Sequence, residues 1–313
     1  MALIRKLPIE LNIGFIRRRA LFLVFSMALM LGSVGVFLTQ GLNLGVDFRG
    51  GILMEVRTPQ PADLGELRSR LGGLGLGEVS LQQFGEPTDV LINIAKQEGD
   101  EEQQIQAIEA VKEALGPGVE MRRQEFVGPK IGDELKEAGF LATVLALLGI
   151  GFYIWLRFEW QFGVAALIAL VHDVIATVGF YSLTQIEFNL ATLAAVLTIA
   201  GYSINDTVVI FDRVRESLRR YKKLPLGEVL NKAINMTLSR TVLTSFTTLL
   251  ALFALFFFGG EVIRGFTAGL IWGVVIGTYS SVGLAVPLLT FIKVRRGGAD
   301  EEDTEAETAE ASS

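Results

Sequence analysis

Long apolar runs recur along this chain of 313 residues, and they restrict its fold more than any other feature. A helix needs about 20 mostly apolar residues to cross the hydrocarbon core of a bilayer. The stretches that satisfy this length are residues 20–40, 138–157, 162–183, 188–211, 240–259 and 266–292. The first is longer than the apolar core of a signal peptide and no small-residue cleavage site follows it, so we expect it to remain as an anchor. The sequence therefore predicts a polytopic α-helical membrane protein with six transmembrane helices.

Lys and Arg residues outside these runs predict the orientation in the membrane. They form three clusters: Arg5, Lys6, Arg17, Arg18 and Arg19 before the first run, Arg213, Arg215, Arg219, Arg220, Lys222 and Lys223 after the fourth, and Lys293, Arg295 and Arg296 after the sixth. With six spans all three clusters fall on one side, which the excess of basic residues in cytoplasmic loops identifies as the cytoplasm. Both termini, residues 1–19 and 293–313, are then cytoplasmic. We expect residues 212–239 to form a basic helix along the cytoplasmic membrane surface, and the acidic end of the chain to be disordered.

Residues 41–136 separate the first two runs and are numerous enough to form a small soluble domain. Strands are expected at residues 52–57, 79–85, 89–95 and 119–127, and helices at residues 61–74 and 104–115. The strands are recognised by alternation of apolar and polar residues and the helices by apolar residues at helical spacing. The resulting order is βαββαβ, the ferredoxin-like split motif. The predicted topology places this α+β domain outside the cytoplasm, in the periplasm.

Two acids and one arginine interrupt the apolar runs. Asp206 is the single carboxylate of the fourth run, Asp173 follows His172 in the third, and Arg240 opens the fifth. An ionised carboxylate at membrane depth costs about 3 kcal/mol on insertion scales, so such a group usually has a function. We expect Asp206 to face the protein interior and to titrate, with Arg240 as a counter-ion that favours its ionised form. Asp206, Arg240, Asp173 and His172 are therefore candidate proton-relay residues, although a neutral structural acid and a packed histidine are alternatives.

Polar and small residues repeat along two of the predicted spans. A polar stripe that we expect to face the bundle comprises Asn205, Thr241, Thr244 and Thr248. Its alternative is that the threonine hydroxyls bond to carbonyl groups of their own helix and that Arg240 extends to the membrane interface. A ridge of small residues in the sixth span comprises Gly265, Gly269, Gly273 and Gly277. This ridge predicts a close contact with another helix.

Several kinds of chemistry have no counterpart in the sequence. The chain contains no cysteine, which excludes disulfides and thiolate metal sites. It contains no HExxH or GxSxG motif, no phosphate-binding loop, and no His, Asp and Glu cluster at metal spacing. We therefore expect no enzymatic activity, no metal and no cofactor, with protons as the coupling ion. The basic stretch 213–223 adjoins a span, so membrane lipids are a more plausible partner for it than nucleic acid.

Longer motifs occur in a fixed order along the chain. They are GVDFRGG (45–51), EFVGPKIGDEL (125–135), RFEWQFG (157–163), ALVHDV (169–174), GYSINDTVVIFDRVRE (201–216) and SRTVLTSFTTLLAL (239–252). Through these motifs the chain resembles the SecF subunits of the SecD/SecF family of protein-export membrane proteins, which is part of the resistance-nodulation-division superfamily. The resemblance implies one half of a bundle of that superfamily, with six helices and one extracytoplasmic insert.

The resemblance also implies a function. Together with SecD, such a subunit uses the proton motive force to complete protein translocation across the bacterial cytoplasmic (inner) membrane after the ATP-dependent SecA step, by proton-coupled movement of its periplasmic domain. The implied partners are SecD, the SecYEG channel, the SecA pathway and exported unfolded polypeptides, with YajC and YidC as further candidates. The key acid of the family matches Asp206, its key arginine matches Arg240, and Asp173 matches its His-Asp pair. The junctions of domain and membrane carry the family residues Asp47, Arg49, Gly50, Gly51, Gly128, Pro129 and Gly132.

Two other functions remain open from the sequence. One is half of an exporter of small molecules or lipids from the same superfamily, although such exporters usually carry two six-helix halves and two large inserts in one chain. The other is a passive scaffold that stabilises a partner without any proton chemistry.

Overall fold

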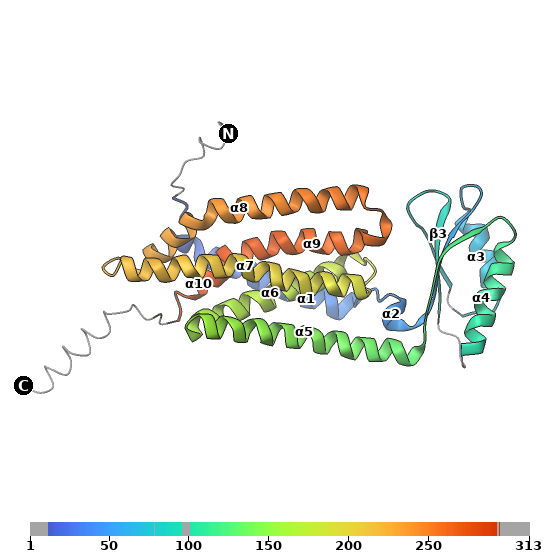
Figure 1. Cartoon of the computed structure of the whole chain (residues 1–313), viewed down its shortest axis with the longest axis horizontal. Helices are drawn as coiled ribbons and strands as arrows, with labels where there is room; N and C mark the ends of the chain where they lie inside the picture. The colour runs from blue at the N-terminus through green and yellow to red at the C-terminus, as the bar shows by residue number, and fades with distance from the viewer. Residues whose placement is uncertain (1–11, 78, 96–100, 293, 295–313) are drawn as a thin grey trace, which may run out of the picture.

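The computed structural model describes residues 12–77, 79–95, 101–292 and 294, which form a long helical bundle with a small domain at one end (Figure 1). Six helices of these residues are long and apolar enough to cross a membrane, which confirms the predicted number of spans. They are α1 (Arg19–Gln40), α5 (Pro129–Arg157), α6 (Trp160–Thr184), α7 (Leu190–Arg220), α8 (Leu226–Phe258) and α9 (Glu261–Ser280). A 3₁₀ turn, η2 (Ile16–Arg18), precedes α1, and a π-helical turn, η3 (Ser281–Ala285), and α10 (Val286–Leu288) continue α9. The predicted termini, residues 1–19 and 293–313, lie largely outside the described residues.

The segment predicted as a separate surface helix, residues 212–239, does not form one. Instead α7 continues to Arg220, and α8 begins at Leu226 and runs without interruption into the fifth span. Pro225 is the N-cap of α8, where a missing backbone N–H leaves no helical hydrogen bond unmade. The apolar residues Val229, Leu230, Ala233 and Ile234 at the start of α8 are fully buried inside the protein. The residues expected to form one separate helix are thus divided between the end of α7 and the start of α8.

The bundle has a buried centre and an apolar exterior. The helices α6 and α9 are the most buried, and α7 packs against α6, α8 and α9. The outer helices α1, α5 and α8 expose large apolar side chains such as Leu145, Phe246 and Phe258. Extended apolar surfaces of this kind indicate contact with a membrane or a partner. The arrangement is that of a multi-pass membrane protein.

The small domain consists of β1 (Gly51–Arg57), α3 (Leu64–Gly72), β2 (Val79–Gln83), β3 (Asp89–Ile94), α4 (Glu101–Leu115) and β4 (Glu120–Val127). Its four strands form one antiparallel sheet in the order β2-β3-β1-β4. Successive side chains of a strand point to opposite faces, and Ile52, Met54 and Val56 of β1 are fully buried in a core shared with α3 and α4. These two helices cover the face of the sheet that is turned away from the bundle (Figure 1). The predicted order of strands and helices is thus observed.

A short helix, α2 (Val46–Arg49), joins the bundle to the sheet. Gly50 and Gly51 follow it with φ angles of 71° and 128°, a region that residues with a Cβ atom rarely adopt. On the return path α5 starts at Pro129, well before the predicted span, so that a single helix leads from β4 into the bundle. A Cβ atom on Gly132 would lie 3.0 Å from the carbonyl oxygen of Phe48. The glycines of the two junction motifs therefore allow α2 and α5 to touch.

Candidate functional site

The carboxyl group of Asp206 lies inside the bundle on α7. Its residue is 6% exposed, and its Oδ2 atom has no hydrogen-bond partner among the described residues. Helical spacing explains the burial, because Ser203, Asp206 and Ile210 follow one another on the inner face of α7. Asn205, which was predicted to join the same polar stripe, is exposed instead. A buried carboxyl without a donor is costly when it is ionised, so this position favours a group that can carry a proton.

Arg240 lies on α8 with its side chain exposed. The ion pairs of the described residues do not include one between Arg240 and Asp206. The guanidinium is nevertheless near enough to attract the Asp206 carboxylate electrostatically. Asp206 and Arg240 therefore interact electrostatically without forming an ion pair.

The polar stripe of α8 divides into two kinds of residue. The hydroxyl of Thr244 donates to the backbone oxygens of Arg240 and Thr241, at 3.0 and 2.9 Å, which is the alternative expected for a hydroxyl in lipid. Thr248 instead accepts a hydrogen bond of 3.2 Å from Tyr202 of α7. Thr241 is 1% exposed, and its hydroxyl has no partner among the described residues. Of these three threonines, Thr248 bonds across to α7, whereas Thr241 is buried with its hydroxyl unpartnered among the described residues.

Asp173 is the centre of a second polar cluster, which we call the Asp173 cluster and which comprises Asp173, His172, Ser203 and Ser280. The Asp173 Oδ2 atom accepts hydrogen bonds from Ser203 of α7 at 2.5 Å and from Ser280 of α9 at 2.7 Å. Its Oδ1 atom lies 2.9 Å from Nδ1 of His172. Asp173, His172 and Ser280 are fully buried, and Nε2 of His172 has no partner among the described residues. The cluster ties α6, α7 and α9 together at one level of the bundle.

Further hydroxyl groups continue this cluster along α7 and α9. The hydroxyls of Thr207, the residue after Asp206, and of Ser281 lie 2.8 Å apart. Ser281 also donates to the backbone oxygens of Gly277 at 2.8 Å and Ser203 at 3.4 Å. Ser281 is the first residue of the π-helical turn in the sixth span, and such turns often occur at functional sites. The hydroxyls of Ser203, Thr207, Ser280 and Ser281 therefore form one band on α7 and α9, which bonds to Asp173 and includes the residue next to Asp206 in the chain.

The glycine ridge of α9 faces the other central helices. A Cβ atom on Gly269 would overlap the hydroxyl of Tyr181 on α6, and one on Gly273 would overlap Ile199 on α7. A Cβ atom on Gly277 would lie 3.0 Å from that of Ser203, and one on Gly265 would lie 3.1 Å from Cγ2 of Ile186. The ridge thus permits the close approach that brings Ser280 and Ser281 to the polar band.

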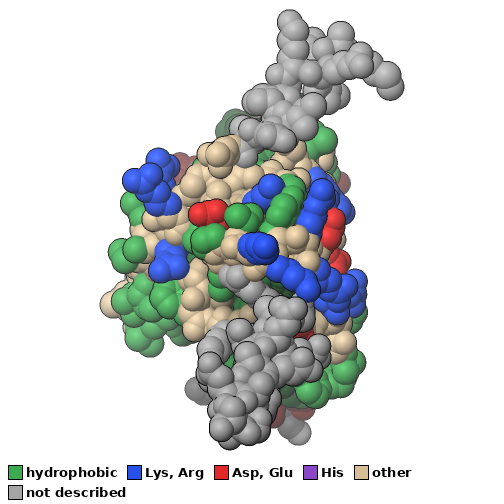
Figure 2. Space-filling model, turned by 90° about the vertical axis from the view of Figure 1, so that its left-hand side faces the viewer, with side chains coloured by type: hydrophobic (Ala, Val, Ile, Leu, Met, Phe, Trp, Pro, Cys, Tyr) green, Lys and Arg blue, Asp and Glu red, His purple; other side chains and the backbone are tan. Residues whose placement is uncertain are grey.

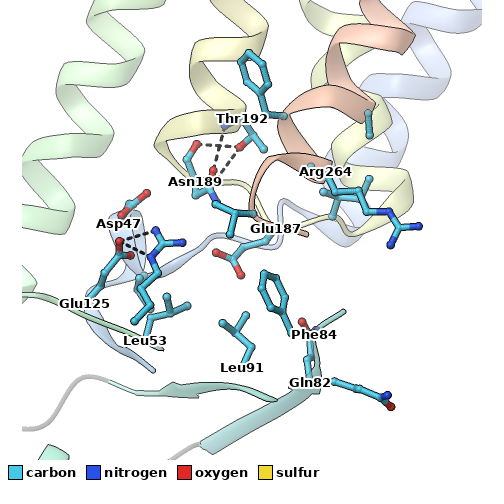
Figure 3. Close-up of a pocket in the computed structure, with 18 of the residues that line it drawn as sticks. Asp47, Leu53, Gln82, Phe84, Leu91, Glu125, Glu187, Asn189, Thr192 and Arg264 are labelled. Carbon is cyan, nitrogen blue, oxygen red and sulfur yellow. Dashed lines mark hydrogen bonds and ion pairs between the residues drawn. The ribbon is translucent and has the colours of Figure 1, made fainter. Parts of the chain in front are cut away.

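The junction between bundle and sheet holds a pocket with a volume of about 330 Å³ (Figure 3). Glu187, in the loop between α6 and α7, points into it between the bundle and the side chains of Phe84 and Leu91 (Figure 3). Burial raises the pKa of the Glu187 carboxyl above its usual range; a hydrogen bond with Asn189 opposes this effect, whereas the nearby Asp47 adds to it. Gly45 makes room for this acid, since a Cβ atom there would lie 2.6 Å from Oε1 of Glu187.

Backbone contacts fasten the same junction. The chain before α2 pairs with the loop before α7, where Gly45 N–H donates to Phe188 O at 2.9 Å and Phe188 N–H donates to Asn43 O at 2.7 Å. The Oδ2 atom of Asp47 accepts a hydrogen bond of 2.8 Å from the N–H of Leu190, the first residue of α7. Arg49 lies beside this contact and lines a neighbouring pocket. Sequence reasoning assigned Asp47 to a junction motif, but it did not identify Glu187, whose burial depends on the folded loop.

Within the described residues no group of three or more His, Asp or Glu side chains is placed to hold a metal ion. The carboxyl and imidazole groups of the buried residues can bind and release protons.

Two family models match the chain. The model described as "Protein export membrane protein SecD/SecF, C-terminal" matches residues 107–295, and the "SecD/SecF GG Motif" matches residues 35–62. The second match contains α2 and the glycines that follow it. Among curated relatives, the protein translocase subunit SecF of Rickettsia rickettsii is 47% identical over 300 residues, which cover 94% of this chain and 96% of the relative. The same subunit of Cereibacter sphaeroides is 44% identical over 310 residues, covering 96% and 95%.

Solved structures agree with these matches. The crystal structure of SecDF, a translocon-associated membrane protein from Thermus thermophilus, superposes with a TM-score of 0.82 at 35% identity and covers 92% of this chain. A structure of SecDF in a super-membrane-facing form superposes with a TM-score of 0.66 at 33% identity and covers 96%. In both cases the chain spans 40% of the length of the solved protein.

Proposed function

The chain belongs to the SecD/SecF family of protein-export membrane proteins, and on that premise we propose that it is a membrane subunit of the Sec protein translocase which uses the proton motive force to complete translocation. The observation that carries the proposal is the Asp206 carboxyl, buried in the bundle with one oxygen unpartnered and with Arg240 nearby but not in contact. An acid at this depth is stable only while it is protonated or paired, so its environment can couple proton binding to a change of shape.

The proposed coupling runs along α7. Protonation of Asp206 would remove its attraction to Arg240 and allow α7 to shift against α8. The first residue of α7 is bonded to Asp47 of α2, so a shift of α7 would be transmitted to the sheet domain. Each elementary charge that crosses 100 mV releases about 2.3 kcal/mol, and a few protons could therefore drive a substantial domain movement. The Asp173 cluster would exchange protons with the band of hydroxyls.

The partner of the chain is proposed to be a SecD-type subunit. The chain corresponds to 40% of a solved SecDF protein, so a second chain would supply the rest of such an assembly, including an acid that opposes Asp206. Further proposed partners are the SecYEG channel, the SecA pathway, exported unfolded polypeptides, and YajC and YidC. The protein would be non-enzymatic, with protons as the coupling ion and no other cofactor.

Membership of the SecD/SecF family also supports a proposal for the membrane orientation of the bundle and for the fold class of the sheet domain. Lys and Arg residues gather at the end of the bundle that is opposite to the sheet domain (Figure 2), which supports a cytoplasmic position for that end in a bacterial inner membrane. The sheet domain would then lie in the periplasm. The element order βαββαβ and the strand order β2-β3-β1-β4 support a ferredoxin-like assignment for this domain, and the six spans support half of a resistance-nodulation-division bundle.

The proposal is tested by export into inverted membrane vesicles that contain the complete complex, with and without a proton gradient. Asp206→Asn should abolish the stimulation of late export by the gradient while the complex still assembles, because the amide cannot exchange a proton. The matched control is Asp212→Asn, two turns along the same helix at an exposed position, which should retain the stimulation. Full stimulation in the Asp206→Asn vesicles would instead support a passive scaffold.

A further inference from the structure

A broad groove opens at the end of the bundle that is remote from the sheet domain. Its volume is about 1040 Å³, and its walls come from residues 12–17, from the end of α7 with the loop that follows it, and from the first part of α8. This end of the molecule also presents most of the basic side chains seen in Figure 2. The lining of the groove includes neither Asp206 nor any residue of the Asp173 cluster.

The wall formed by residues 12–17 is held in place by two asparagines of α8. The Asn235 side chain accepts from Ile13 N–H at 2.8 Å and donates to Ile13 O at 3.0 Å, which binds both backbone groups of one residue. Asn231 accepts from Ile16 N–H at 3.3 Å. Ile16 is buried in the main hydrophobic core, and Gly227 leaves room for it, since a Cβ atom there would lie 3.3 Å from Cγ2 of Ile16. The groove is therefore a built feature of the fold.

The charged lining of the groove is mainly positive. It includes Arg17, Arg213 and Lys232, against the single acid Glu228. Arg213 bonds Glu216 through Nη1 only, at 2.6 Å, and Lys232 lies over the ring of Tyr221 with Nζ 4.3 Å from its centroid. Arg17 is exposed and forms no ion pair within the described part of the chain. Three cations thus converge on one opening with donors that remain available to an anion.

An apolar strip leads out of the groove along α8. Met236 lines the groove and is 44% exposed, and Leu243 and Leu250 follow at intervals of seven residues with exposures of 59% and 55%. Residues seven apart lie on the same face of a helix. The strip therefore runs from the groove along an exposed side of the fifth span. A polar opening followed by an apolar strip of this kind matches the form of a phospholipid.

We propose that this groove binds the headgroup of an anionic phospholipid, with its phosphate among Arg17, Arg213 and Lys232 and an acyl chain along Met236, Leu243 and Leu250. Charge complementarity favours an anionic over a zwitterionic headgroup, and basic side chains next to a span lie at the depth of the phosphates. A lipid bound here would bridge the segment before α1 and the start of α8. It would thereby hold these two segments together, as the hydrogen bonds of Asn231 and Asn235 do.

The test uses the full-length chain, purified in a neutral detergent and titrated with phosphatidylglycerol or phosphatidylcholine under native mass spectrometry. The groove variant is Arg17→Gln with Lys232→Gln. The control variant is Arg219→Gln with Lys223→Gln, which removes the same charge from exposed positions outside the groove. Removal of two basic contacts should weaken the tightest phosphatidylglycerol binding by about tenfold or more in the groove variant and by less than about twofold in the control. Phosphatidylcholine should bind weakly to all three proteins.

Three results would overturn the proposal. An equal loss of phosphatidylglycerol binding in both variants would indicate a diffuse basic surface, and displacement of phosphatidylglycerol by inorganic phosphate would indicate a site for a free anion. Equally tight binding of phosphatidylcholine would show that the groove does not select an anionic headgroup. The charge-preserving variant Arg17→Lys with Lys232→Arg should keep the binding. If the groove variant loses its helical circular dichroism, Lys232→Gln alone replaces it, with an expected weakening that the single control Lys223→Gln does not show.

Discussion

Asp47 bonds to the start of α7: its Oδ2 atom accepts a hydrogen bond of 2.8 Å from the N–H of Leu190, across 143 residues of sequence. The first N–H groups of a helix have no partner within it, and the helix dipole favours a negative charge there. The helix that carries Asp206 in its interior is therefore held at its outer end by the segment that leads into the sheet domain. This contact is the most direct link between the buried acid and the domain that is proposed to move.

Replacing Asp47 by Ala should loosen this link. The loss of an acceptor at a helix start costs about 1 kcal/mol, so amide hydrogens in the first turn of α7 should exchange roughly fivefold faster. Hydrogen exchange followed by mass spectrometry of peptides covering residues 186–196 measures the effect. Glu134→Ala, an exposed acid on α5 near the same junction, is the control and should leave these peptides unchanged. Unchanged exchange in Asp47→Ala would mean that the contact does not hold α7.

The Asp173 cluster should depend on its serine donors. Ser280→Ala removes one of the two hydroxyls that bond Oδ2 of Asp173, and the poorly satisfied buried group should destabilise the protein by about 1–3 kcal/mol. Thermal unfolding in detergent measures this change. Ser239→Ala, at an exposed position of α8, should shift stability by less than about 0.5 kcal/mol. Equal midpoints for the two variants would show that the Ser280 bond contributes nothing.

The glycine ridge should tolerate no side chain at its centre. Gly273→Ala would force Cβ into Ile199, and overpacking of this kind typically costs about 1–3 kcal/mol. Gly149→Ala on α5 is the matched control, because a Cβ atom there meets nothing within 4 Å; it should be neutral or stabilising, since alanine is the better helix former by about 1 kcal/mol. A lower unfolding temperature for Gly273→Ala alone is expected, and a matched drop in both proteins would contradict the packing described for α7 and α9.

The junction pocket should make the protein sensitive to pH through Glu187. Its pKa is raised, first by burial, so the protonated form stabilises the folded junction. This contribution is fully present below the ordinary pKa of a glutamic acid, about 4.3, and is lost as the pH rises through the raised value of the folded state. The charged groups that act on Glu187 are Asp47, Arg123 and Glu125.

Unfolding midpoints measured across acid and neutral pH test this expectation. The Glu187→Gln variant should lose that part of the pH dependence, because its side chain stays neutral throughout. Glu86→Gln, an exposed acid in the turn before β3, should keep the profile of the unchanged protein. A Glu187→Gln profile that coincides with the unchanged one would assign the pH dependence to other groups.

Sequence patterns predicted the elements of this protein better than the contacts between them. Apolar length predicted the six spans, and alternation in residues 52–57 and 89–95 predicted strands that form as β1 and β3. The cost of an ionised carboxylate at membrane depth also predicted that Asp206 faces the interior, where it is buried. Each of these properties depends on one segment alone and can therefore be predicted without knowledge of the rest of the chain.

Properties that depend on the rotation of one helix against another were not predictable. The Asp173 cluster needs Ser203 and Ser280 to turn towards α6, and nothing in their local sequence distinguishes them from other membrane serines. Arg240 directly precedes the buried Thr241, yet it lies on the exposed side of α8. Glu187 is enclosed only because the sheet domain folds over its loop.

The central claim is that Asp206 binds and releases protons while the complex translocates a polypeptide. Proteoliposomes that contain the complete complex, a translocating polypeptide and a pH-sensitive dye inside measure proton flux directly. The account predicts flux that depends on translocation in the unchanged protein and in Asp212→Asn, and none above background in Asp206→Asn. An undiminished flux in Asp206→Asn would contradict the account.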